Sequence, residues 1–160
     1  VIMSIDGSKQ KVRLPKGVKD DQKIRLRKKG RPGVNGGAPG DLVITIHVGT
    51  HPVFTRDHDN LRIVLPVTFA EATLGAKIEV PLLDGSSVTV KVPAGTQSGA
   101  VLRVRGRGVE TSKTKGDLLI EVRVAVPKDL NDTQKAALEG FIATLEDSDP
   151  RAELLTKAKA

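Results

Sequence analysis

Histidines and their neighbouring carboxylates are the residues of this chain whose types could support acid–base or metal chemistry. The sequence contains His47, His51 and His58, and Asp57 and Asp59 flank the last of them. Imidazole and carboxylate groups bind transition metals, so His51, Asp57 and His58 could together form a metal site. Their spacing matches no recognised ligand motif, and the surrounding HPVFTRDHDN is typical of an exposed turn between domains. We therefore predict that the chain binds no metal.

Motifs of nucleophilic and phosphate chemistry are also missing from the sequence. It contains no Gly-x-Ser-x-Gly elbow and no nucleotide loop that ends in Gly-Lys-Ser/Thr. The glycine-rich GRPGVNGGAPG lies between two predicted antiparallel strands rather than between a strand and a helix, so we interpret it as a hairpin loop. Composition does not exclude a Ser–His–Asp triad, but nothing in the sequence singles one out. The prediction is a protein without catalytic residues and without cofactors.

The composition favours a small β-rich protein. A chain of 160 residues suits one medium-sized domain or two small ones. Hydrophobic residues make up 38% of it without forming a run that could cross a bilayer, so we expect a soluble protein with no membrane partner. Aromatic residues are only 2%, which leaves Val, Ile and Leu to form the core and favours strands. The absence of Cys excludes disulfides and thiolate zinc sites and fits a reducing cytoplasm.

The charge is strongly basic and has two interpretations. The formal net charge is +7, which favours association with acidic partners such as nucleic acid. Alternatively, the Lys and Arg side chains solvate the outer faces of strands. We favour the second interpretation, because proteins that bind single strands usually stack bases on aromatic side chains and this chain has neither Tyr nor Trp.

An internal repeat organises the chain. Residues 6–30 (DGSKQKVRLPKGVKDDQKIRLRKKG) align without a gap on residues 84–108 (DGSSVTVKVPAGTQSGAVLRVRGRG), and residues 40–44 match residues 116–120 after a variable loop. In both copies, apolar and charged residues alternate as in half-buried strands. The repeat predicts two β-domains of similar topology that meet near residues 50–60 and pair their strands alike.

The lead-in to each copy differs. Asp-Gly at residues 6–7 and 84–85 predicts a tight hairpin turn in both copies. Before the second turn, residues 61–65 alternate as a strand, and residues 69–74 are predicted to form a short helix that Gly75 ends. Only five residues precede the first turn, so we expect the first domain to lack a counterpart of about residues 60–78.

The C-terminal part of the chain is predicted to be helical. Asn131 is a suitable N-cap, and Gln134 three positions later completes a capping-box pattern. Asp149-Pro150 ends the pattern, and residues 151–160 form a short charged tail. The helix carries one apolar stripe with helical spacing, made by Leu138, Phe141, Ile142 and Leu145.

These segments resemble the C-terminal region of DnaJ-type co-chaperones. The segment from KVRLPKGV to HPVFTRDHDNL is similar to the end of their first C-terminal domain. LPVTFAEATLGAKIEVPLLDG, VKVPAGTQSGAVLRVRGRGV and GDLLIEVRVAVPKDLNDTQKAALEGF are similar to their second C-terminal domain and terminal helix. The tail DSDPRAELL is similar to actinobacterial members. The chain contains neither the His-Pro-Asp triplet of a J-domain nor zinc-finger repeats.

The resemblance implies an all-β fold with two tandem β-sandwich-like domains, a short helix in the second domain and a C-terminal helix. It divides the chain into a truncated first domain (residues 1–55), a second domain (residues 56–128) and a dimerisation helix with its tail (residues 129–160). It further implies a bacterial cytoplasmic protein that binds unfolded client polypeptides and delivers them to an Hsp70-type chaperone.

The resemblance also implies the residues of two sites. Leu42 and Ile44 are expected to line a peptide-binding groove, and Ile2 is expected to face it from a neighbouring strand. The alternative is that all three are ordinary core residues. The apolar stripe of the C-terminal helix is expected to form a homodimer. The rival function is a basic nucleic-acid-binding module that contacts phosphates through KIRLRKKGR.

Overall fold

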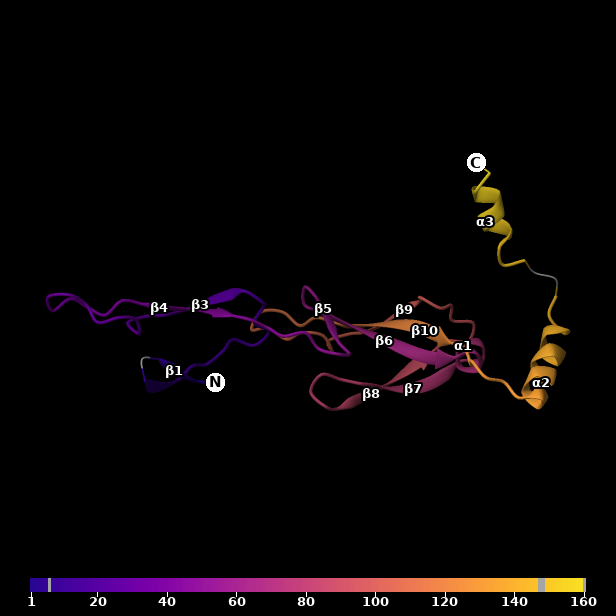
Figure 1. The fold of residues 1–160 in the computed structure, drawn as a ribbon, viewed down its shortest axis with the longest axis horizontal. Coiled ribbons are helices and arrows are strands. Elements are labelled where there is room, and N and C mark those ends of the chain that lie inside the picture. The colour runs from indigo at the N-terminus through magenta and orange to yellow at the C-terminus, as the bar shows by residue number, and fades with distance from the viewer. Residues whose placement is uncertain (6, 147–148, 160) are drawn as a thin grey trace. The chain divides into compact units, whose positions relative to one another are not determined.

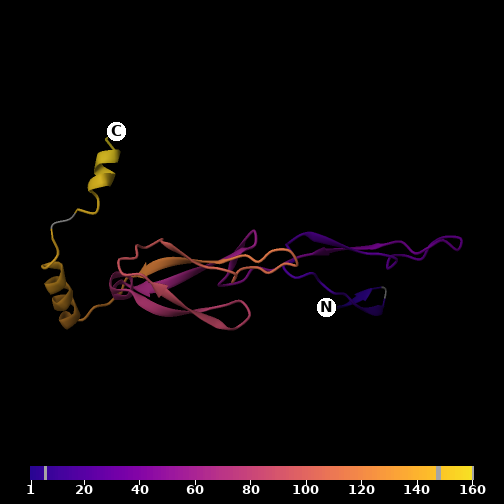
Figure 2. The same ribbon diagram turned by 180° about the vertical axis from the view of Figure 1, so that it is seen from behind.

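The computed structural model describes residues 1–5, 7–146 and 149–159, and the chain divides into two compact units (Figures 1 and 2). The first unit comprises residues 1–125 and the second comprises residues 126–160. Asp6 of the first predicted Asp-Gly turn lies outside the described residues. The described residues form ten strands and three short helices, which confirms the all-β class with a helical C-terminal part.

The second repeat is built on a four-stranded sheet with the order β5-β6-β10-β9. The parallel pair at its centre joins β6 (Asn60–Thr68) to β10 (Leu118–Ala125). The antiparallel edges are β5 (Thr55–Asp57) and β9 (Val101–Val104). Buried and exposed residues alternate along the whole of β6, as the sequence pattern predicted for its first half.

A short helix and a hairpin complete this repeat. Helix α1 (Phe69–Leu74) begins in a capping box between Thr68 and Glu71 and ends at Gly75, whose φ of 82° is one that glycine adopts without strain. The hairpin that follows pairs β7 (Ala76–Pro81) with β8 (Ser87–Val92). Apolar side chains from these elements and from the sheet form one core, whose fully buried members include Val67, Val80, Val92, Leu118, Ile120 and Val122.

The first repeat pairs its long strands as the second repeat does. Strand β3 (Gln22–Leu26) is antiparallel to β4 (Leu42–Ile46), with Ile24 opposite Ile44. The aligned residues of the second repeat, Leu102 and Ile120, also lie opposite each other. The register is therefore the same in both copies, which confirms the predicted pairing for these strands.

The two hairpins differ by one residue. In the first copy β1 (Ile2–Ile5) pairs with β2 (Ser8–Lys11), and Ile5 lies opposite Ser8. In the second copy the backbone N–H of Leu82 donates to the carbonyl oxygen of Ser86, so three residues separate the paired positions instead of two. Loop length sets the register of a hairpin, so the aligned Asp-Gly sequences do not guarantee equal pairing.

The described residues of the second unit contain two helices. Helix α2 (Asp132–Ile142) begins with the predicted capping box: the Asn131 side chain accepts from the backbone N–H of Gln134, and the Gln134 side chain accepts from the backbone N–H of Asn131. The predicted tail contains a further helix, α3 (Ala152–Lys157), in which Lys157 pairs with Glu153 one turn earlier. None of the described helices has the length and apolar character needed to cross a membrane.

Gly116 provides a test of the packing around the second sheet. A Cβ at this residue would overlap the carbonyl oxygen of Asp59, so Gly116→Ala must displace the turn between β5 and β6. We expect Gly116→Ala to lower the free energy of unfolding by about 3 kcal/mol. Gly49→Ala is the control, because no atom lies within 4 Å of its added Cβ, and it should change stability by less than about 1 kcal/mol. Urea titrations of both variants that gave equal midpoints would contradict this packing.

Candidate functional site

The predicted groove residues Leu42 and Ile44 lie on one face of β4. Ile44 is nearly buried, with 9% of its surface exposed, and Leu42 and Ile46 on either side of it are half-buried. Because neighbouring side chains of a strand point to opposite faces, Val43 lies on the other face, where 56% of it is exposed. The structure therefore brings Leu42 and Ile44 together in an apolar row that continues to Ile46.

Ile2 is more exposed than the other predicted groove residues. It lies on β1 opposite Lys11, and 69% of its surface is exposed. In the described part of the chain, β1 pairs with β2 and with neither strand of the β3–β4 pair. Ile2 is therefore an apolar surface residue of the first hairpin and does not share a sheet with Ile44.

A carboxylate fixes the start of β4. Asp41 Oδ2 accepts a hydrogen bond from Arg25 Nε at 2.6 Å, and its Oδ1 accepts one from the backbone N–H of Lys28 at 2.8 Å. The second contact holds Lys28 in the left-handed region with a φ of 55°, a conformation that lysine rarely adopts. Asp41 thus ties the end of β3 to the beginning of β4.

The second repeat contains the same arrangement at the aligned positions. Asp117 Oδ1 accepts from the backbone N–H of Gly106 at 2.9 Å, and its Oδ2 lies 3.3 Å from Arg103 Nη1. Gly106 has a φ of 71°, so the backbone adopts the same left-handed turn as at Lys28. The motif that the repeat preserves is therefore an Arg–Asp clamp across a strand pair. Its residues align between the two copies, but the alignment does not show that they are in contact.

The hydrogen bonds to Asp41 also change its acidity. The pKa of the Asp41 carboxyl lies below its ordinary value, first because the backbone N–H of Lys28 donates to it and second because the Arg25 side chain donates to it. The carboxylate form is the one that accepts both hydrogen bonds, so the clamp is ionised at neutral pH.

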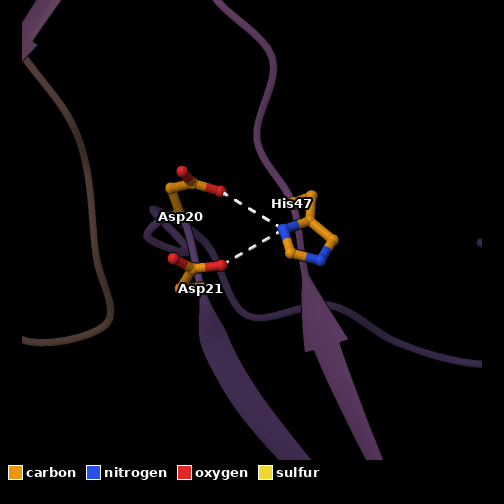
Figure 3. Close-up of side chains that lie close together, drawn as sticks. All are labelled: Asp20, Asp21 and His47. Carbon is orange, nitrogen blue, oxygen red and sulfur yellow. Dashed lines mark ion pairs between the residues drawn. The ribbon is translucent and has the colours of Figure 1, made fainter.

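His47 gathers with two carboxylates at the other end of the β3–β4 pair (Figure 3). Its Nδ1 lies 3.1 Å from Asp21 Oδ1 and 4.0 Å from Asp20 Oδ1. Asp20 also accepts a hydrogen bond from the backbone N–H of Val48 at 2.8 Å. All three side chains are exposed, so we assign no metal to the cluster and interpret it as a polar end of the strand pair. The strand register could have predicted this cluster. Gln22 lies opposite Ile46, so Asp21 and His47 are the next residues beyond this pair.

The two histidines considered for a metal site, His51 and His58, make different contacts. His51 Nδ1 accepts hydrogen bonds from the backbone N–H groups of Val53 and Phe54, at 3.1 and 3.2 Å, and so closes a turn. His58 pairs with Asp57 at 2.9 Å. His51 is therefore a structural residue of the linker between the repeats.

The predicted dimerisation stripe is exposed in the second unit. Leu138, Phe141 and Ile142 lie on α2, whereas Leu145 follows the end of the helix, where its backbone N–H donates to the carbonyl oxygen of Ile142. Between two-fifths and three-fifths of each of the four side chains is exposed. The apolar stripe is thus continuous with the turn that ends the helix.

Comparison with known proteins identifies the family. The sequence profile of the DnaJ C terminal domain matches residues 4–127. The chain belongs to the DnaJ C-terminal domain family. It is 53% identical to Chaperone protein DnaJ 1 of Streptomyces coelicolor over 149 residues. This aligned stretch covers 92% of this chain and 37% of that protein. It is 49% identical to Chaperone protein DnaJ 2 of Cutibacterium acnes over 140 residues, which cover 87% of this chain and 37% of that protein.

The relatives confirm the actinobacterial resemblance of this DnaJ C-terminal region. Chaperone protein DnaJ 1 of Mycobacterium tuberculosis is 48% identical over 144 residues, which cover 88% of this chain and 36% of the relative. The chain therefore spans little more than a third of the length of the curated relatives it matches. The match to the family profile includes both repeats and both Arg–Asp clamps.

The Asp41 clamp makes a testable prediction about pH. Because its pKa is lowered in the folded state, the clamp contributes stability above the pKa of unfolded Asp, and this contribution is lost as the pH falls through the folded pKa. In an NMR titration of the side-chain carboxyl, we expect the Asp41 midpoint to lie below that of an unfolded Asp. Arg25→Gln should raise this midpoint only part of the way, because the hydrogen bond from Lys28 remains. An ordinary midpoint in the unaltered chain would contradict the clamp.

Proposed function

We propose that this DnaJ C-terminal region binds unfolded client polypeptides and presents them, as a homodimer, to an Hsp70-type chaperone in the bacterial cytoplasm. The proposal assigns it binding and assembly and no catalytic step. It follows from the family, whose matched relatives are named chaperone proteins, and from the apolar row on β4.

One observation carries the client-binding part of the proposal. Leu42 and Ile46 remain half-buried, whereas their counterparts in the second repeat, Leu118 and Val122, are fully buried. The same strand pair with the same register thus forms closed core in one repeat and a partly open apolar face in the other. Extended polypeptides bind such faces by placing alternate apolar side chains against them. Ile44, with Leu42 beside it, is therefore the proposed centre of the client site, and the exposed Ile2 is the proposed outer contact.

The stripe of α2 supports the dimerisation part. Burying a Leu, Ile or Phe side chain is worth roughly 1.5–3 kcal/mol, so several exposed ones favour association. A second copy of the same stripe is a suitable partner, because two-fold symmetry brings identical surfaces together. Two copies would hold two client sites, and a client that engaged both would bind with higher avidity.

A distribution of charge favours a second candidate, nucleic-acid binding. Eleven Lys and Arg residues and three Asp residues lie within residues 1–40, which gives this part a formal net charge of +8, whereas the rest of the chain is close to neutral. Phosphate contacts release counterions and weaken steeply as salt rises, whereas burial of apolar side chains depends little on salt. We favour client binding because the apolar row on β4 remains partly open, and because Arg25, one of these cations, is already engaged by Asp41.

Substitution of Ile44 tests the client site. Ile44→Asp places a carboxylate where apolar side chains should dock, and its desolvation should weaken binding of an apolar peptide by about tenfold or more. Val43→Asp is the matched control, because it adds the same charge on the opposite face of the same strand. Fluorescence anisotropy with a labelled peptide gives the affinities. Far-UV circular dichroism shows whether each variant is folded.

The outcomes separate the possible faces. If Ile44→Asp does not fold, Leu42→Asp replaces it, since the half-buried Leu42 tolerates a charge better. Full binding by whichever of these two variants folds would remove this row from the client site. Loss of binding by Val43→Asp alone would move the site to the other face of β4.

Substitution of Phe141 tests the dimer. Light scattering on the unaltered chain at micromolar concentration should report twice the mass of one chain, and Phe141→Asp should shift this value toward one chain because it places a charge in the apolar stripe. Leu154→Asp on the exposed face of α3 is the control and should remain dimeric. A well-folded chain that was monomeric without any substitution would contradict dimerisation through α2.

A further inference from the structure

Arg56 joins the first repeat to the second within the first unit. Its Nη1 and Nη2 donate to the carbonyl oxygens of Val18 and Gly17, at 2.9 and 3.0 Å, and its Nε donates to the carbonyl oxygen of His58 at 2.7 Å. A Cβ on Gly17 would lie 2.7 Å from Thr111 Cγ2, so the turn after β2 packs directly on the loop before β10. The two repeats are therefore in direct contact, and the Arg56 guanidinium at this junction is hydrogen-bonded through all three of its nitrogen atoms.

A cavity of about 600 Å³ lies beside this junction. Phe54 and Leu61 in its lining are buried, whereas Val48 and Leu83 are 46% and 55% exposed and so lie toward its mouth. Both repeats contribute to its apolar lining, which consists of Val18, Val48, Phe54, Leu61, Leu83 and Val109. A cavity of this size can hold a large apolar side chain.

The charged groups around the cavity favour a cation. Asp20 and Glu110 belong to its lining and are exposed, whereas the positive charge of Arg56 is engaged by carbonyl oxygens and by Asp59. Lys16 Nζ lies 3.8 Å from Glu110, but such exposed pairs contribute little, so a cation from a partner can replace it. The cavity therefore combines an apolar interior with one carboxylate at its edge from each repeat, Asp20 and Glu110.

We propose that this cavity is a second anchor point for the same extended client that lies along β4. It would bind one large apolar side chain that is flanked by Lys or Arg. This inference rests on the proposed client-binding function and deepens it. The chain leads from β4 into the cavity, since Val48, which lines it, follows Ile44 by four positions. An extended chain rises about 3.3 Å per residue, so Val48 at the mouth of the cavity lies at most roughly 13 Å from Ile44 along the chain.

The test compares two peptides on the complete chain. The long peptide carries two Leu anchors four residues apart, and it is made in two versions with a Lys beside the first or beside the second Leu. The short peptide carries one Leu anchor only. We expect the long peptide to bind about tenfold more tightly, because a second Leu is buried. Leu83→Asp should remove this gain and leave the short peptide unaffected. Leu74→Asp, on an exposed part of α1 outside this cavity, is the control and should retain the gain.

The charge of the cavity edge has its own readout. Exchanging Lys for Glu in the long peptide should weaken its binding by about threefold, and Glu110→Gln should reduce that difference, because Asp20 then remains as the one carboxylate at the edge. Equal affinities of the long and short peptides, or an unchanged gain in Leu83→Asp, would overturn this inference and leave the β4 site intact. Failure of both peptides to bind the unaltered chain would overturn the proposed function and this inference with it.

Discussion

The clamp between a strand arginine and the aspartate that begins the next strand is the contact on which both repeats depend. In each copy the carboxylate accepts a backbone N–H from a left-handed turn, at Lys28 and at Gly106, and pairs with an arginine on the strand before it. This fixes where the second strand starts and hence its register. A slip by one residue would exchange the apolar and polar faces of that strand. The identical pairing of β3–β4 and β9–β10 follows from this constraint.

The strand pairs β3–β4 and β9–β10 share one register but differ in how far their apolar side chains are buried. In the second repeat, β10 is paired on both edges, and its inward side chains belong to a core that β6, α1 and the β7–β8 hairpin complete. In the described part of the first repeat, β4 pairs with β3 alone, and its inward row remains partly open. The second repeat therefore holds the closed core, whereas the first leaves apolar side chains partly exposed. The basic residues of the first repeat are exposed, and along β3 Lys23 and Arg25 alternate with the half-buried Ile24 and Leu26.

The sequence predicted those features that depend on local pattern. Alternation identified strands such as β3, β4 and β6, but it misplaced β2, which ends at Lys11 before the alternating Val12 and Leu14. Gly75 ended the short helix as expected, and Asn131 with Gln134 capped α2. Features that depend on loop geometry or on contacts distant in the sequence could not be predicted. Aligned Asp-Gly sequences gave hairpins that differ by one residue, because neighbouring residues also set loop length. Arg56 contacts Val18 and Gly17, which precede it by 38 and 39 positions, and no local periodicity predicts such a contact. Alternation placed Leu42 and Ile44 on one face, and the family resemblance was what singled them out as groove residues.

The central claim is that the apolar face of the first repeat, and not its basic charge, holds the partner. Backbone amide shifts of the chain, recorded by NMR during titration with an unfolded apolar client segment, test it most directly. We predict that the largest changes occur in β4 and the facing residues of β3, and that they persist when the salt concentration is raised, because apolar burial is little affected by screening. Changes confined to residues 27–31 that disappear in high salt would contradict the account and favour phosphate-type binding.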